Sequence, residues 1–85
     1  MNLVQIALAR HALGLDGRLS TSYRNRFFAG RGHADFDEWM AMVKQGDATR
    51  SDPMMHGGAF LFELTRKGAE RALLPHEKLD PEDFP

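Results

Sequence analysis

The stretch DFDEWMAMVKQGDATR, residues 35–50, decides the fold, because a helical pattern ends within it and a strand begins. Asp35 is a favourable N-cap residue, and Glu38 follows it at the spacing of a capping box. Gly46 suits the left-handed conformation in which many helices end. The spacing therefore predicts one helix in this stretch, with an apolar face formed by Phe36, Trp39, Met40 and Val43.

After this helix the apolar pattern changes to the two-residue period of a strand. Residues 48–50 predict a short strand, and residues 59–64 predict a second one with strict alternation. Asp52-Pro53 and Gly57-Gly58 bracket the loop of the resulting hairpin. Thr65 then provides the N-cap of a last helix. Glu63 is expected to face solvent, and the residues expected to face inward are Phe60, Phe62, Leu64, Ala69, Ala72 and Leu73.

The amino-terminal third predicts two more helices. Residues 2–13 are rich in Ala and Leu and carry a broad apolar stripe, and Gly14 suits the position just after a helix. A short helix is also predicted within residues 18–32, capped by Ser20, Thr21 or Ser22, carrying Tyr23, Phe27 and Phe28, and stopped by Gly30 and Gly32.

Together these elements predict a single α+β domain over residues 1–74, with three amino-terminal helices, a β-hairpin and a carboxy-terminal helix. Residues 75–85 are acidic and rich in proline, so we expect them to form a flexible tail. The predicted core consists of Leu3, Ile6, Ala7, Leu13, Phe27, Trp39, Met40, Val43, Phe60, Phe62, Leu64 and Leu73.

The order helix, helix, helix, hairpin, helix resembles that of a winged-helix domain. Residues 39–73 carry the resemblance, with Met42-Val43-Lys44-Gln45-Gly46 before the first strand and Leu64-Thr65-Arg66-Lys67-Gly68 at the start of the last helix. In winged helices the helix before the wing usually enters the major groove of DNA. The chain departs from this pattern, because that helix begins here with the acids Asp35, Asp37 and Glu38.

The chain as a whole also resembles small proteins of unassigned role from tailed phages and prophages. The segments behind this resemblance are residues 10–14, 23–27 and 68–70. The phage resemblance indicates a source and not an activity. Together with the charge pattern and the lack of a catalytic motif described below, the resemblances lead us to expect a small winged-helix-like accessory or regulatory protein that binds a macromolecule and does not catalyse a reaction.

The charge of the chain is divided unevenly, although its net charge is only −1. Residues 1–34 carry a net +4, and residues 35–85 carry a net −5. Such a division indicates a macromolecular partner rather than a small-molecule substrate. The absence of cysteine excludes disulfides, cysteine–zinc sites and thiol catalysis. No stretch predicts a membrane span or a signal peptide, so we expect a cytoplasmic protein without a membrane partner.

Residues 18–31 are the strongest candidate for a binding site. They interleave arginines with aromatic residues; an arginine fork matches a phosphate, and an aromatic ring can stack on an unpaired base. In the alternative interpretation, the rings belong to the core and the arginines pair with the acids of residues 35–38. The residues predicted to bind nucleic acid are Arg18, Arg24, Arg26 and Arg31, with Tyr23 and Asn25 assisting.

A second hypothesis is that the protein inhibits or modulates a host system, such as a defence complex or the transcription machinery, by binding one of its proteins. Methionines in the hairpin loop suit an apolar patch on such a partner. The residues assigned to this hypothesis are Asp35, Asp37, Glu38, Met54 and Met55. The sequence indicates no catalytic residue, metal site or cofactor, since its histidines are scattered and no serine or carboxylate pair has catalytic surroundings.

Overall fold

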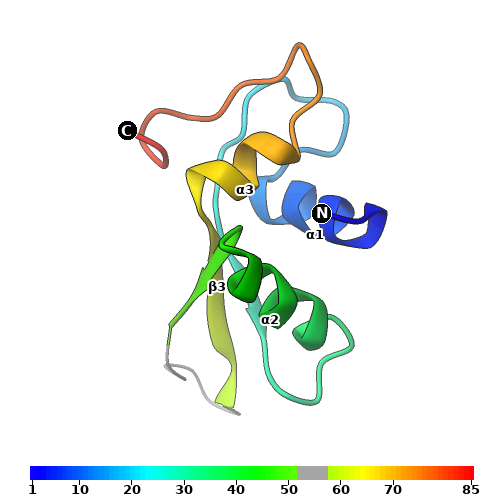
Figure 1. Ribbon diagram of the computed structural model, residues 1–85. Coiled ribbons are helices and arrows are strands. Elements are labelled where there is room, and N and C mark those ends of the chain that lie inside the picture. Colours follow the sequence, from blue (N-terminus) through cyan, green and yellow to red (C-terminus); the bar gives the residue numbers. More distant parts are fainter. Residues whose placement is uncertain (52–57) are drawn as a thin grey trace.

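The computed structural model describes residues 1–51 and 58–85, which contain three helices and three strands. The elements are α1 (Leu3–Leu13), β1 (Phe27–Ala29), α2 (Phe36–Gln45), β2 (Ala48–Arg50), β3 (Phe60–Leu64) and α3 (Arg66–Arg71). Figure 1 shows the sheet and α2 in the lower half of the molecule, with α1 and α3 above them. Met54 and Met55, assigned to protein binding from the sequence, lie outside the described residues.

The three strands form one antiparallel sheet in the order β1-β3-β2. β2 and β3 pair as the predicted hairpin strands, with Ala48 opposite Leu64. Phe60, Phe62 and Leu64 are buried and Glu63 is exposed, so the predicted alternation is confirmed. The structure is therefore a small α+β domain in which three helices accompany a three-stranded sheet.

The prediction of a helix within residues 18–32 is wrong, because the segment leads into a strand, β1, and forms no helix. Phe27 lies opposite Phe62 of β3 and packs on the core, whereas Phe28 points to the other side and is exposed. Strand alternation separates the two rings in this way, and the sheet supplies partners for the backbone. Ser22, expected as a helix cap, instead accepts a hydrogen bond from the backbone of the carboxy-terminal segment.

The end of α1 and the start of α3 follow their predicted signals, Gly14 and Thr65, whereas the N-cap of α1 was not predicted. Asn2 caps α1 by accepting a hydrogen bond from the backbone nitrogen of Gln5 at 2.8 Å. Gly14 ends the helix in the left-handed region, with φ of 77°. Thr65 caps α3, since its hydroxyl accepts a hydrogen bond from the backbone nitrogen of Gly68 at 3.1 Å.

The capping box predicted for α2 does not form. Asp35 occupies the N-cap position but makes no capping hydrogen bond with its side chain. Its backbone is already helical, with ψ of 0°, whereas a capping residue usually has an extended backbone that directs its side chain at the free N–H groups. Glu38 instead accepts a hydrogen bond from the side chain of Gln5 at 3.3 Å. Gly46 ends the helix as predicted.

Trp39 lies at the centre of the core and is fully buried. Its ring lies 5.2 Å from that of Phe27 and 5.5 Å from that of Phe62, measured between centroids. Such offset aromatic pairs stabilise a core beyond the area that they bury. One side chain of α2 thus contacts both β1 and β3.

The predicted core is confirmed at Leu13, Trp39, Phe60, Phe62 and Leu64. The prediction of a core position is wrong for Leu3, which is 85% exposed, and for Ala7, which is also exposed. Both lie on the outer side of α1, while the opposite side, with Gln5, Ala9, Ala12 and Leu13, faces the core. The other residues predicted for the core are partly buried: Ile6, Phe27, Met40, Val43 and Leu73.

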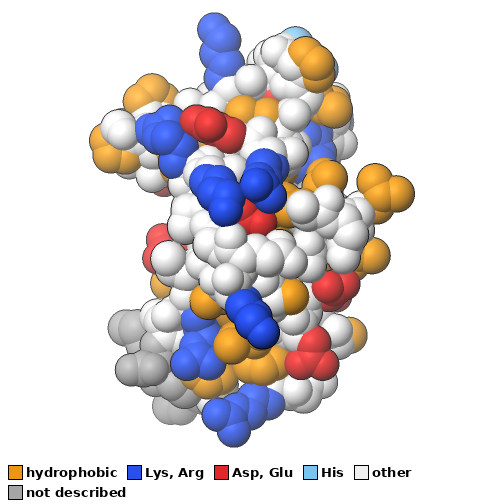
Figure 2. Space-filling view, in the orientation of Figure 1, with side chains coloured by type: hydrophobic (Ala, Val, Ile, Leu, Met, Phe, Trp, Pro, Cys, Tyr) orange, Lys and Arg blue, Asp and Glu red, His pale blue; other side chains and the backbone are white. Residues whose placement is uncertain are grey.

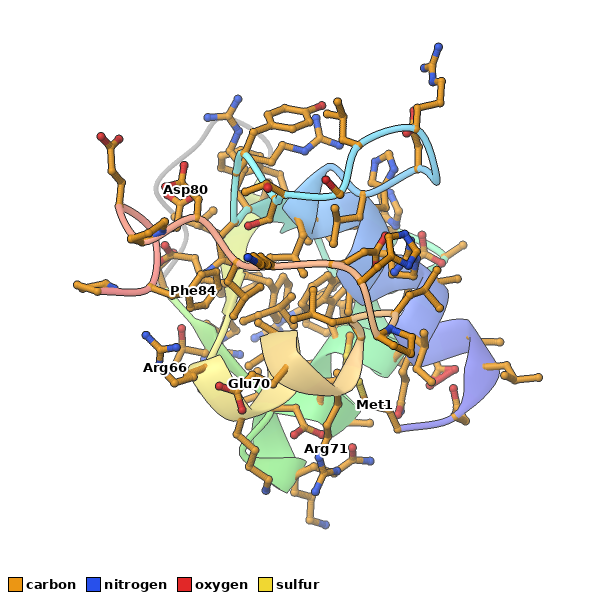
Figure 3. The ribbon with its side chains drawn as sticks, turned by 90° about the horizontal axis from the view of Figure 1, so that it is seen from above. Met1, Arg66, Glu70, Arg71, Asp80 and Phe84 are labelled. Atoms are coloured by element: carbon orange, nitrogen blue, oxygen red, sulfur yellow. The ribbon has the colours of Figure 1, made fainter. Side chains whose placement is uncertain are left out.

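Residues 75–85 lie against the domain, whereas the sequence predicted that the domain ends at residue 74 and that a flexible tail follows. Lys78 accepts a hydrogen bond at its carbonyl from the backbone of Ser22 at 3.0 Å. Figure 1 shows this segment, in orange and red, returning beside the pale-blue segment before β1. Phe84 is buried, and Arg66 donates a hydrogen bond to its carbonyl. Figure 3 shows Phe84 and Arg66 on the same side of the molecule.

A buried ion pair fixes the start of this segment. The side chain of Glu77 has no solvent exposure, and Arg10 of α1 donates a hydrogen bond to each of its oxygens. The backbone nitrogen of Leu74 donates a third hydrogen bond at 2.8 Å. These bonds, and above all those from Arg10, lower the pKa of Glu77 from 4.5 to about 2. The ionised carboxylate therefore holds α1 and the carboxy-terminal segment together.

We expect the substitution Glu77→Gln to lower the free energy of unfolding by about 3 kcal/mol at neutral pH, since it leaves Arg10 without its anion. Because the pKa of Glu77 is lower in the folded state than in the unfolded state, the carboxylate stabilises the fold fully above about pH 5. This stabilisation is lost as the pH falls toward 2. Urea unfolding should be measured at about pH 7 and about pH 3. The difference in the free energy of unfolding between the unmodified protein and Glu77→Gln should be about half as large or less at the lower pH.

The control for this experiment is Glu63→Gln, since Glu63 is exposed and forms no ion pair with the described residues. It should leave the free energy of unfolding unchanged within about 0.5 kcal/mol. A destabilisation by Glu77→Gln that stays equal at both pH values would contradict the role of the ionised carboxylate.

Gly68 of α3 approaches the backbone of Asp47 too closely for any side chain. A methyl group on Gly68 would overlap the carbonyl oxygen of Asp47, which already accepts a hydrogen bond from the backbone of Thr65 at 3.0 Å. We expect Gly68→Ala to destabilise the fold by about 2–3 kcal/mol in thermal or urea unfolding, although alanine favours helices. The matched control is Gly32→Ala, which has open space around it and should change stability by less than about 0.5 kcal/mol. Equal stability of the two variants would contradict the close approach.

Candidate nucleic-acid interface

The residues predicted to bind nucleic acid do not form one surface. Two hollows near the carboxyl end of α1 are both lined by Tyr23. Arg24 lines one of them and Arg18 lines the other, so these three residues lie together. Arg31 lies in the turn after β1. Arg24 precedes β1 and Arg31 follows it, so the strand separates the two arginines along the chain.

The donors of Arg18 and Arg24 are largely engaged within the molecule. Arg18 pairs with Asp16, with 2.8 Å between Nη2 and Oδ2, and both side chains are exposed. Hydrogen bonding within this pair lowers the pKa of Asp16 and raises the pKa of Arg18. Arg24 donates from Nη2 and Nε to the carbonyl of His11, at 2.7 and 3.2 Å. It therefore adds to the hydrogen bonds at the end of α1, where the carbonyl of His11 also accepts one from the backbone nitrogen of Gly14 at 3.1 Å.

Tyr23 and Asn25 have different roles. The ring of Tyr23 covers Gly14, where any side chain would overlap it, yet the residue remains 55% exposed. The amide of Asn25 accepts a hydrogen bond from the backbone nitrogen of Leu64 at 2.8 Å and donates one to its carbonyl at 3.0 Å. The side chain of Asn25 thus bonds to β3 at a position just before β1 begins. Its amide is engaged in the sheet. Tyr23 is partly exposed, and the guanidinium of Arg24 lies over its ring, 5.3 Å from the centroid.

In the arginine-rich segment, residues 18–31, the arginines with open side chains are Arg26 and Arg31. Both are exposed, and neither pairs with a carboxylate in the part of the chain that the structure describes. Phe28 lies between them in sequence and is 45% exposed. These three residues, with Tyr23, are the members of the segment that remain available to a partner.

The acids predicted for protein binding lie at the start of α2. Asp35 has a carboxylate oxygen 3.9 Å from Nδ1 of His33, and Asp37 is exposed. Glu38 is half-buried and contacts Gln5. Within the described residues none of the three pairs with an arginine of the segment, so the ion pairs required by the alternative interpretation do not form.

A second group of basic residues gathers where α2, β2 and α3 meet, and the sequence did not single it out. Lys67 donates from Nζ to the carbonyl of Gln45 at 3.0 Å, which brings α3 to the end of α2. Arg50 of β2 lies 3.7 Å from the sulfur of Met40, one helical turn before Lys44. We call this group the basic face; its members are Lys44, Arg50, Lys67 and Arg71.

Asp47 is the acid that accompanies the basic face, and it is fully buried. Its oxygens lie 4.0 Å from Nζ of Lys67 and 3.6 Å from Nη1 of Arg71, without a hydrogen bond to either oxygen from the described residues. A buried carboxylate is costly unless cations lie close to it. Asp47 therefore attracts two cations of α3 to one place, and their remaining donors face solvent.

The other two cations of the basic face have no acidic partner among the described residues. The guanidinium of Arg50 lies over the ring of Phe60, 4.5 Å from its centroid. Lys44 is exposed in the last turn of α2. Figure 2 shows Lys and Arg side chains following one another down the middle of this view, with acidic side chains mostly toward its edges. The basic face thus presents positive charge to solvent from three elements.

Part of the basic face could have been found from the sequence. Lys67 and Arg71 are four residues apart on a predicted helix, a spacing that places them on one face. Lys44 and Arg50 join them only through the pairing of β2 with β3 and the packing of α2. No local pattern indicates those contacts.

Within residues 1–51 and 58–85, no three or more His, Cys, Asp or Glu side chains gather as a metal site would require. No helix of this part of the chain has the length and apolar character needed to cross a membrane. Comparison with protein-family models, with curated proteins and with solved structures found no match to the chain. Its function is therefore inferred from its own residues and their arrangement.

Proposed function

We propose that this protein binds nucleic acid through its basic face, mainly by contacts to phosphate. The observation that supports this proposal most is the ratio of charges: of four cations from three elements, two lie near the buried carboxylate of Asp47, and the other two pair with no acid among the described residues. The surplus positive charge stays at the surface and attracts a polyanion. Each phosphate that is contacted also releases condensed counterions, which adds to the affinity.

The arrangement of the cations suits phosphate groups. The guanidinium of Arg50 lies over the ring of Phe60, which holds its plane and leaves donors at its edge. Lys67 and Arg71 lie one helical turn apart, and Asp47 holds both near the same point. Contacts to phosphate carry no sequence information, so we expect little sequence specificity.

The resemblance to winged-helix domains is part of this proposal. α2, the β2–β3 hairpin and α3 follow one another in the expected order. Thr65 and Gly68 of the Leu-Thr-x-x-Gly motif cap α3 and allow its close approach to Asp47. In this proposal the carboxyl end of α2, with Lys44, faces the nucleic acid, and the acidic amino end lies away from it.

The arginine-rich segment 18–31 is the competing surface for the same function. Arg26 and Arg31 are open, but Arg18 and Arg24 already have partners in the fold. Each surface therefore retains two open cations, and the basic face is favoured because Asp47 holds two further cations close together on it.

The proposal is tested by measuring the anisotropy of labelled duplex and single-stranded oligonucleotides at about 50 and about 200 mM salt. Lys44→Ala/Arg50→Ala should weaken binding by about 10-fold or more at the lower salt concentration, because two phosphate contacts are lost. The slope of log K against log salt should fall from about −4 to about −2 for duplex DNA. Lys67 and Arg71 are left in place, because their loss would leave Asp47 buried without a cation.

The matched control is Arg24→Ala/Arg26→Ala, which removes the same charge from the arginine-rich segment. It should change affinity less than twofold. If this control weakens binding and Lys44→Ala/Arg50→Ala does not, the segment is the interface and the basic face is not. No salt-dependent binding by the unmodified protein would overturn the function itself.

A further inference from the structure

α1 is apolar on its outer side as well as on its core side. The core side, which includes Ala12 and Leu13, is fully buried. On the outer side Leu3 is 85% exposed and Val4 is 53% exposed, and Ala7 is exposed as well. A helix that is apolar all round is usually buried all round. The outer side of α1 therefore has the character of an interface.

These residues form a continuous strip because of the helical spacing. Ala7 follows Val4 by three residues and Leu3 by four, and His11 follows Ala7 by four. Tyr23 extends the strip at the carboxyl end, since its ring covers the glycine that ends α1. We call this surface the α1 strip; its members are Leu3, Val4, Ala7, His11 and Tyr23.

A hollow of about 320 Å³ opens beside Tyr23. It is large enough to receive one bulky apolar side chain of a partner. Side chains that enter such pockets contribute most of the binding energy at many interfaces. The lining includes Ala7, Gly14, Leu15 and Tyr23, together with the polar side chains of His11, Asp16 and Arg24.

The charge around the α1 strip is positive. Asp16 is the one acid that lines the hollow, and Arg18 neutralises it at 2.8 Å. Arg24 then leaves a positive charge at the carboxyl end of the strip, since it pairs with no carboxylate among the described residues. α1 itself contains no acidic residue. The charge beside the apolar surface therefore complements an acidic partner.

We propose that the α1 strip binds an acidic amphipathic helix of another protein. Apolar side chains at helical spacing would cover Leu3 and Val4 and fill the hollow beside Tyr23. Acidic side chains next to them would be attracted by the charge of Arg24, whose Nε and Nη2 stay bonded to the carbonyl of His11. This proposal stands independently of nucleic-acid binding, because the α1 strip and the basic face share no residue.

A second copy of this chain and a lipid surface fit the α1 strip less well. A second copy would bring the same strip, which has no free acid to pair with Arg24. A bilayer surface has no fixed side chain that fills the hollow. An acidic helix supplies both an apolar face and the complementary charge.

The test uses a synthetic peptide of about 15 residues with leucines at helical spacing and glutamates beside them. Isothermal titration should give a Kd of about 10–100 µM, as expected for an interface of this size. The same peptide with lysines in place of the glutamates should bind at least about 10-fold more weakly. Ala7→Glu should also weaken binding of the glutamate peptide by about 10-fold or more.

Ala7→Glu replaces an exposed helical residue by another good helix former, so the fold should persist, which circular dichroism and thermal unfolding will check. Leu3→Ser/Val4→Ser removes exposed side chains only and provides a second variant with the same expected loss. The control is Leu74→Ser, an exposed leucine outside α1, which should bind the glutamate peptide normally. All three variants should bind nucleic acid as the unmodified protein does.

Several results would overturn the proposal. They are equal binding of the two peptides, binding of neither, or equal affinity of the Leu74→Ser and Ala7→Glu variants. Self-association of the protein in analytical ultracentrifugation that Ala7→Glu abolishes would assign the α1 strip to a second copy instead. Binding to phosphatidylglycerol vesicles without binding to the glutamate peptide would assign it to a lipid surface.

Discussion

The stacking of Trp39 between Phe27 and Phe62 is the contact on which the rest of this structure depends. Because Phe27 must face Trp39, its segment extends as a strand, and Phe28 faces the opposite side of the sheet. The indole nitrogen of Trp39 has no hydrogen-bond partner among the described residues. Leaving a buried N–H group without a hydrogen bond costs about 1–3 kcal/mol, so the packing of the rings must outweigh this cost.

The positive charges of the amino-terminal third mostly serve the fold. Arg10 holds Glu77 in the interior, Arg24 bonds to the end of α1, and Arg18 pairs with its neighbour Asp16. Charge counted along the sequence therefore overstates the charge that this segment offers to a partner. For the basic face, charge counted along the sequence understates the charge that is offered to a partner, because this face lies in the half of the chain with a net negative charge. Its cations come together through the fold, and the acid that lies near two of them, Asp47, is buried.

Elements with a strong local pattern could be predicted from the sequence, and contacts between distant segments could not. α2 has both a helical period and a terminal glycine, and β3 has strict alternation, so both were predicted. β1 has only three residues, and its two adjacent phenylalanines suit a helix as well as a strand. α1 is apolar on both sides, so its period could not indicate which side faces the core. The pairing of Arg10 with Glu77 joins residues 67 apart in the sequence, and no local signal indicates it.

The two proposed surfaces follow from a single limit on a chain of this size. A domain of 85 residues can bury only about 60% of the surface of its unfolded chain, so some apolar and charged surface must remain outside. Here the remaining surface is sorted by type: cations gather where α2, β2 and α3 meet, and apolar residues gather on the outer side of α1. Because the two proposed surfaces share no residue, the two proposals are compatible within one molecule. Simultaneous binding would make the protein a bridge that brings its protein partner to nucleic acid.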